Sequence, residues 1–283
     1  MQIEGQVLLR LQRLGIDIVG GCQLRCVGCP NSTLPHPIRF MSPDTFSRIL
    51  GNVNVGHVEY LKLYNFGEIM LHNDLLEMVV QIPKQRFSVR HVEISTNGQC
   101  INKDLEGVIG SNIITRFGVS VDGDCTPEEY ERLRPPGKWD KLCEFLRFVQ
   151  MYGIKKTRTE FFLKVICTDK ASEPKWTSFA ARFGAKVEFR KWRKAADSIM
   201  FQGFNVNART GPCKHVESTR IRCYVDWNGD VVPCCCHPRA SVFGNLKEQK
   251  FSEIYKGKDR ESFIRLMRRH RKEHKICGKC EVK

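Results

Sequence analysis

Apolar residues recur along the chain in short runs rich in β-forming side chains, and segments with helical spacing separate these runs. The six predicted strands are Leu14–Val19, Val58–Phe66, His91–Thr96, Ile113–Val121, Thr159–Cys167 and Ala185–Trp192. The six helices predicted between and after them are Thr45–Leu50, Leu75–Ile82, Leu105–Ile109, Glu128–Leu133, Trp139–Tyr152 and Ser172–Phe183. Strands that alternate with helices predict βα units and a parallel α/β sheet. The pattern alone leaves open whether that sheet is open or curled.

This alternation stops near residue 195, where Gly, Asn and Cys become frequent. Two apolar runs, Ile221–Trp227 and Asp230–Cys234, flank Asn228-Gly229 and predict a β-hairpin. Helices are expected at Ser252–Tyr255 and Lys258–Lys275. We therefore predict two domains: an α/β domain at 1–195 and a small cysteine-rich α+β domain at 196–283.

Composition narrows the class of protein. A chain of 283 residues with 41% apolar and 27% charged residues is typical of a globular protein with one large domain and a small addition. No apolar run approaches the ~20 residues that cross a bilayer, and the first residues lack the pattern of a secretory signal. We expect a cytoplasmic protein with no membrane partner.

Fourteen cysteines stand out in such a chain. A reducing cytoplasm disfavours disulfides, so metal ligands, catalytic groups or small buried side chains are expected. Cys22, Cys26 and Cys29 have the spacing C-x3-C-x2-C directly after the first predicted strand. Three thiolates on one loop can share a metal centre and leave a position open for substrate. A structural zinc loop is the alternative, although such sites usually add a second, distant pair of cysteines.

With this loop, the chain resembles the radical S-adenosylmethionine (SAM) superfamily. Three strand-end motifs add to the resemblance: Asn65-Phe66-Gly67-Glu68, Ser95-Thr96-Asn97-Gly98 and Ser120-Val121-Asp122-Gly123. Each motif by itself also suits an ordinary turn. Three positions depart from the family pattern: Gly28 replaces a frequent aromatic residue, Phe66 a glycine and Ile69 a proline.

The resemblance implies a partial (β/α)6 TIM-like barrel with functional groups at the carboxyl ends of its strands. It also implies a [4Fe-4S] cluster bound by Cys22, Cys26 and Cys29, with SAM on its fourth iron. The residues it implies for SAM binding are Gly67, Glu68, Ser95, Asn97, Ser120 and Asp122.

A second group of cysteines occupies the C-terminal part of the chain. Its pattern resembles the SPASM and shorter Twitch domains of radical SAM enzymes, which bind auxiliary [4Fe-4S] clusters. The resemblance implies one auxiliary cluster with the ligands Cys213, Cys234, Cys277 and Cys280. Cys235 or Cys236 could replace Cys234, because adjacent side chains on a strand point to opposite faces.

The last predicted helix contains eight basic residues: Lys258, Arg260, Arg265, Arg268, Arg269, Arg271, Lys272 and Lys275. The net charge of the whole chain is +15. This face can be simply solvated, or it can dock an acidic electron donor such as flavodoxin or ferredoxin. It can also attract a phosphorylated small substrate. RNA ranks last, because aromatic residues do not alternate with the basic ones.

The resemblance implies reductive cleavage of SAM to a 5′-deoxyadenosyl radical that abstracts hydrogen from a substrate. Dehydrogenation or a related oxidation of a small, polar, anionic, sugar- or nucleotide-like molecule is the leading prediction. Only 13 residues precede Leu14, which disfavours the leader-binding domain of peptide-modifying relatives. The alternatives are a peptide-, protein- or RNA-modifying enzyme and an iron–sulfur electron-transfer protein. Candidate catalytic or substrate contacts are Arg134, Lys164, Glu188 and Arg190.

Overall fold

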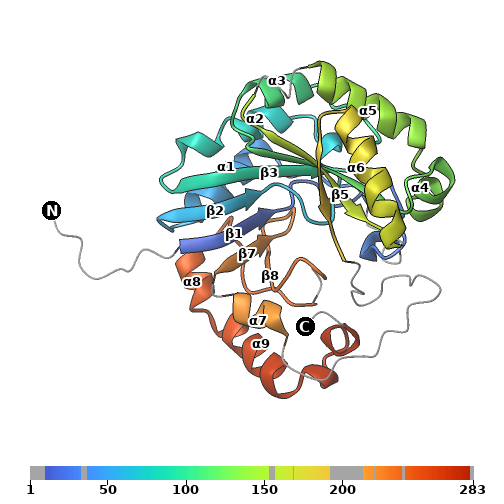
Figure 1. Cartoon of the computed structure of the whole chain (residues 1–283). Helices are drawn as coiled ribbons and strands as arrows, with labels where there is room; N and C mark the ends of the chain where they lie inside the picture. The colour runs from blue at the N-terminus through green and yellow to red at the C-terminus, as the bar shows by residue number, and fades with distance from the viewer. Residues whose placement is uncertain are drawn as a thin grey trace.

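The protein is built around one eight-stranded sheet with the order β6-β5-β4-β3-β2-β1-β7-β8 (Figure 1). The computed structural model describes residues 10–32, 37–152, 157–167, 169–191, 213–219, 221–237 and 240–280. The strands are β1 (Arg10–Ile16), β2 (His57–Lys62), β3 (Ser88–Thr96), β4 (Arg116–Asp122), β5 (Glu160–Ile166), β6 (Lys186–Phe189), β7 (Arg222–Val225) and β8 (Val231–Val232).

Nine α-helices lie in the described part of the chain. They are α1 (Pro43–Asn52), α2 (Leu75–Val79), α3 (Leu105–Gly110), α4 (Pro127–Leu133), α5 (Trp139–Met151), α6 (Glu173–Arg182), α7 (Lys214–Ser218), α8 (Phe251–Tyr255) and α9 (Lys258–Arg269). Three short 3₁₀ helices matter below: η2 (Ile69–Leu71), η7 (Arg271–Glu273) and η8 (Cys277–Lys279). None of the described helices is long and apolar enough to cross a membrane.

The predicted βα units are confirmed, since β1 to β6 pair in parallel and in sequence order. Helix starts follow the expected chemistry: the Ser42 hydroxyl accepts the Thr45 N–H, and the Thr126 hydroxyl accepts the Glu129 N–H. Because right-handed βα crossovers bring parallel strands side by side in the same direction, all their carboxyl ends meet at one rim.

The C-terminal part continues the same sheet, which the sequence pattern did not predict. β7 pairs in parallel with β1, with Leu14 opposite Cys223, and β8 adds the antiparallel edge. Cys223 is buried there, as expected for a small core side chain. The predicted domain boundary near 195 falls outside the described residues.

Several predicted bounds were wrong. β1 ends at Ile16 rather than Val19, and β2 ends at Lys62, so Tyr64 and the following motif form a rim loop. Helix α9 ends at Arg269, where His270 leaves the helical conformation. Arg271, Lys272 and Lys275 therefore lie beyond the helix that was expected to carry them.

Candidate active site and auxiliary cluster site

A cavity of about 460 Å³ opens at the carboxyl ends of the parallel strands. It is lined by the three loop cysteines and by residues from each strand-end motif. These predicted site residues are Cys22, Cys26, Cys29, Gly67, Glu68, Ser95, Asn97, Ser120, Asp122, Arg134, Lys164 and Arg190. Residues from seven separate chain segments thus meet at one rim, four of them carrying the cysteine loop and the three strand-end motifs. Glu188, the remaining candidate, is not among the described residues that line it.

The loop that carries the three cysteines is held by backbone hydrogen bonds to the segment after α4. The Arg25 N–H donates to the Pro135 carbonyl (2.6 Å), and the Val27 N–H donates to the Leu133 carbonyl (2.8 Å). Burial raises the pKa of the Cys22 thiol to about 12 and that of Cys26 to about 11. Iron binding must therefore release thiol protons, because the thiolate is the ligand.

Gly67 is required by close packing. A Cβ on this residue would lie 1.5 Å from the Val19 carbonyl oxygen, so the loop passes the segment after β1 at a distance that no larger residue allows. The Asp17 carboxylate, which sequence analysis missed, accepts the backbone N–H groups of Asn65, Phe66 and Gly67. Burial raises the pKa of Asp17 to about 7, against the lowering effect of these hydrogen bonds.

Glu68 is buried, and its carboxylate accepts three hydrogen bonds from within the protein. Its carboxylate accepts the Met70 N–H (3.0 Å), the Thr96 hydroxyl (2.5 Å) and the Asn97 N–H (2.7 Å). A carboxylate has about four acceptor positions, so one remains for a ligand such as the SAM amine. Asn97 in turn donates from its amide nitrogen to the Cys22 sulfur (3.4 Å). These contacts join the cluster loop to the ends of β2 and β3.

Arg134 follows α4 and lies against the cluster loop. Its guanidinium pairs with Asp122 at the end of β4, and only 7% of the residue is exposed. The pKa of Arg134 is well above its usual value: burial opposes its charge, but Cys26 and Asp122 stabilise it more strongly. Asp122 therefore holds the positive charge of Arg134 beside Cys26 in the cavity wall.

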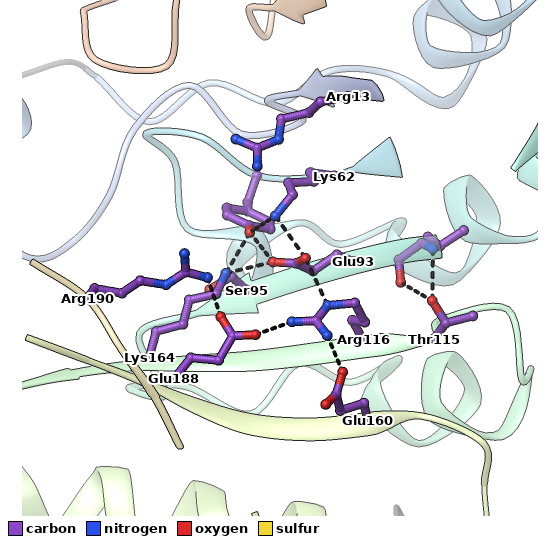
Figure 2. Close-up of polar contacts among 12 residues, drawn as sticks. Arg13, Lys62, Glu93, Ser95, Thr115, Arg116, Glu160, Lys164, Glu188 and Arg190 are labelled. Atoms are coloured by element: carbon purple, nitrogen blue, oxygen red, sulfur yellow. Dashed lines mark hydrogen bonds and ion pairs between the residues drawn. The ribbon is translucent and has the colours of Figure 1, made fainter. Parts of the chain in front are cut away.

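Inside the barrel, below the cavity, lies a network of charged side chains (Figure 2). Glu93 on β3 accepts hydrogen bonds from Lys62 (2.8 Å), Lys164 (2.9 Å) and Arg116 (3.2 Å), and from the Tyr64 hydroxyl. Although burial opposes its charge, the pKa of Glu93 is well below its usual range because of Lys164 and Lys62. Burial lowers the pKa of Lys164 to about 8. Tyr64 and Glu93 could not be predicted from the sequence, because the network forms only across strands.

Glu188 belongs to the outer part of this network. It pairs with Arg116 and Arg190, while Arg116 also pairs with Glu160. Its role in the described structure is to hold these two arginines.

The four predicted auxiliary ligands converge, although they come from three distant segments. The pKa of Cys277 rises to about 12, first through burial and then through the charges of Cys234, Cys280 and Cys213. Cys235 instead faces Tyr224 and Arg13, and the Cys236 sulfur lies 3.6 Å from His215 Nε2. The donor atoms of His215, Cys235 and Cys236 lie within 4.8 Å of one another, so the choice of Cys234 among the three adjacent cysteines stays a prediction.

Two residues of the basic C-terminal region hold the turn that carries Cys277 and Cys280. Arg271 donates to the carbonyls of Cys277 (3.2 Å) and Cys280 (2.6 Å), and His274 Nδ1 accepts the Cys277 N–H (3.0 Å). Arg260 is also buried and stacks on Tyr255. The expected basic surface is therefore smaller than eight residues, because Arg260 and Arg271 serve the interior.

Comparison with known proteins agrees with this geometry. Residues 16–172 match the model of the radical SAM superfamily, and residues 213–281 match SPASM, an iron–sulfur cluster-binding domain. The first match covers more than half of the chain, so the protein belongs to the radical SAM superfamily, with a C-terminal SPASM domain. Its fold is the TIM-like partial barrel expected from the sequence.

One curated relative is a probable GTP 3′,8-cyclase from Methanothermobacter marburgensis, 28% identical over 130 residues. That match spans 46% of this chain and 41% of the relative, so the chain matches less than half of the length of that protein.

Solved structures show the fold over nearly the whole chain. BtrN in complex with AdoMet and 2-DOIA has a TM-score of 0.59 at 17% identity and covers 95% of this chain and 92% of that one. AnSMEcpe with bound AdoMet has a TM-score of 0.65 at 15% identity, with 95% and 84% covered. Streptococcus suis SuiB bound to precursor peptide SuiA has a TM-score of 0.59 at 14% identity, with 96% and 70% covered.

The residues present fit the cofactors of the family: a [4Fe-4S] cluster with SAM, and an auxiliary iron–sulfur cluster. Three soft sulfur donors line a cavity beside a carboxylate with a remaining acceptor position, and four more sulfur donors converge in the SPASM domain.

Proposed function

We propose that this radical SAM enzyme oxidises a small, polar, anionic molecule, with the auxiliary cluster as the electron acceptor. The observation that carries the proposal is that the three loop cysteines, the SAM-motif residues and four basic side chains line one cavity. Its volume of about 460 Å³ lies within the ~300–1,000 Å³ typical of small-molecule sites.

When bound, the cluster and SAM supply a radical that removes a hydrogen atom from a substrate C–H bond. The protein contributes binding, orientation and electrostatics. We propose Glu68 and Asn97 for holding SAM, together with Gly67, Ser95, Ser120 and Asp122. Arg134 places its charge beside Cys26.

Loss of a second electron and a proton completes an oxidation. We propose Lys164 for the proton, because it lines the cavity and burial lowers its pKa to about 8. Lys62 and Arg116 stay bonded to Glu93, so a neutral Lys164 would not leave that buried carboxylate unpaired. Cys213, Cys234, Cys277 and Cys280 would hold the auxiliary cluster, which would supply an acceptor for this electron.

A nucleotide rearrangement is the second candidate, and the match to a probable GTP 3′,8-cyclase favours it. For the external electron we propose an acidic donor such as flavodoxin or ferredoxin, which would dock on the exposed side of α9 at Arg265 and Arg269.

The test is an anaerobic assay of the reconstituted full chain with dithionite, SAM and a panel of sugar phosphates and nucleotides. Dehydrogenation predicts one 5′-deoxyadenosine per product and a product lighter by two hydrogens. A product of unchanged mass would support the rearrangement instead. Failure to form 5′-deoxyadenosine in the wild type, as in a Cys26→Ala control, would contradict both.

A further inference from the structure

Four basic side chains from four strands or strand ends point toward one another in the barrel interior (Figure 2), and all four act on Tyr64 by contact or by charge. They are Arg13, Lys62, Lys164 and Arg190, and we call them the cation cluster. Lys164 lies 2.5 Å from the Tyr64 hydroxyl and Lys62 lies 3.1 Å from it. The charges of Arg13 and Arg190 both act on Tyr64 and on Lys62. Like charges held this close repel one another unless an anion lies among them.

The described carboxylates do not balance this charge. With Arg116 and Lys186, the network holds six basic side chains against three carboxylates, Glu93, Glu160 and Glu188. The excess is three positive charges when Lys164 is protonated and two when it is neutral, as the proposed proton transfer requires. Arg13 has no carboxylate partner within the described chain, and its one hydrogen bond there is a long contact with Tyr224 (3.5 Å). Burial opposes the charge of Arg13, but Tyr224, Cys235 and Tyr64 stabilise it, so its pKa lies above its usual value; the groups that offset this charge are weak acids rather than a carboxylate.

The cluster also has donors left for a ligand. Lys164 uses two of its three N–H groups, on Tyr64 and Glu93. Arg190 uses one nitrogen, on Glu188. Lys164, Arg190 and the neighbouring Lys191 line the cavity, so these donors face the space that a substrate would occupy.

We propose that the cation cluster binds a phosphate group, and that the substrate is therefore a small phosphorylated molecule. A phosphate monoester carries about −1.5 to −2 at pH 7, which comes close to the excess of two or three, whereas a carboxylate supplies only −1. Its three oxygens can accept from Lys164, Arg190 and Lys191, which line the cavity, while Arg13 contributes its charge to the same cluster. The inference rests on the proposed function only in taking this ligand to be the substrate.

The test is calorimetric titration of the anaerobically reconstituted full chain with inorganic phosphate and, separately, with acetate at matched ionic strength. Binding of phosphate but not acetate is expected, and Arg190→Gln should weaken it at least tenfold. Arg265→Gln is the matched control, because Arg265 is also an exposed arginine with one glutamate partner. Arg13→Gln should weaken binding similarly, and Arg13→Lys should restore part of it.

Absence of phosphate binding would overturn the proposal, and so would equal binding by wild type and Arg190→Gln. Acetate binding as tight as phosphate would point to a carboxylate substrate instead. Arg190 is about half exposed, so this variant keeps the test valid even if Arg13→Gln fails to fold. Formation of 5′-deoxyadenosine by the same preparations separates this outcome from failure of the radical chemistry itself.

Discussion

The two cysteine sets of this protein are built in opposite ways. Cys22, Cys26 and Cys29 lie within eight residues, on a loop held by its own backbone contacts to Leu133 and Pro135. The auxiliary set is drawn from Cys213, Cys234, Cys277 and Cys280, which meet only after β7, β8 and the C-terminal turns have assembled. The first site is local in the sequence, whereas the second depends on the tertiary fold.

The comparison implies that substitutions affect cluster binding at the two sites in different ways. A change in the first loop removes a ligand directly beside the cavity, where no other described thiol can replace it. In the second site Cys235 and Cys236 stand next to Cys234, and the site also depends on non-ligand residues such as Arg271 and His274.

Removing one cysteine ligand from each site should give the largest difference in SAM cleavage. Cys26→Ala is expected to abolish 5′-deoxyadenosine formation, because the cluster that binds SAM is lost. Cys277→Ala is expected to lose the auxiliary cluster and keep SAM cleavage. Chromatographic assay of 5′-deoxyadenosine after dithionite reduction measures both, with Cys143→Ala in α5 as a control outside either site. Equal loss of SAM cleavage in the two ligand variants would refute the separation.

Gly67→Ala is expected to have the next largest effect, a loss of thermal stability caused by a steric clash. The added Cβ would overlap the Val19 carbonyl at 1.5 Å, so the rim loop must move and thermal stability should fall steeply. Gly51→Ala in α1 is the control, since a Cβ there meets nothing within 4 Å and should stabilise the helix by about 0.5–1 kcal/mol. Similar melting temperatures for the two variants would contradict the packing argument.

Arg271→Gln probes the second site without touching a ligand. Loss of its hydrogen bonds to the Cys277 and Cys280 carbonyls should cost about 1.5–3 kcal/mol, because the donor is charged and buried. The auxiliary cluster should then release iron faster to a chelator, while Arg265→Gln on the surface behaves as wild type. An unchanged release rate would show that the turn holds its shape without Arg271.

The last expected effect is the pH dependence from Asp17, which changes the stability of the rim loop without touching either cysteine set. Burial, and then the charge of Asp226, raise its pKa to about 7 from an unfolded value near 3.8. Between these values the native state keeps a proton that the unfolded chain releases, so stability falls as pH rises from about 4 to 7 and levels off above. The slope is at most about 1.4 kcal/mol per pH unit. The asparagine of Asp17→Asn is neutral at every pH and resembles protonated Asp17. The melting temperatures of wild type and Asp17→Asn should therefore separate between pH 5 and 7, with the wild type falling below the variant; parallel curves would exclude this titration.

Sequence reasoning placed the six βα units and the cavity-lining motifs well, because strand patterns and turns such as Asn97-Gly98 are local signals. It missed the pairing of β7 with β1, since nothing in either segment specifies a partner more than 200 residues away. Asp17 and Glu93 were missed for the same reason. The hydrogen-bond partners of a single acidic residue in an apolar run lie on other strands and loops, so the sequence does not predict them. Arg271 was taken for a surface charge because burial of a long basic side chain depends on what covers it.

The most direct test of two separate clusters is the iron content of the anaerobically reconstituted chain, measured for wild type and Cys277→Ala alongside 5′-deoxyadenosine formation. Two [4Fe-4S] clusters predict about eight irons per wild-type chain and about four in the variant, with SAM cleavage kept in both. About four irons in the wild type, unchanged in the variant, would contradict the account and leave the converging C-terminal cysteines without a cluster.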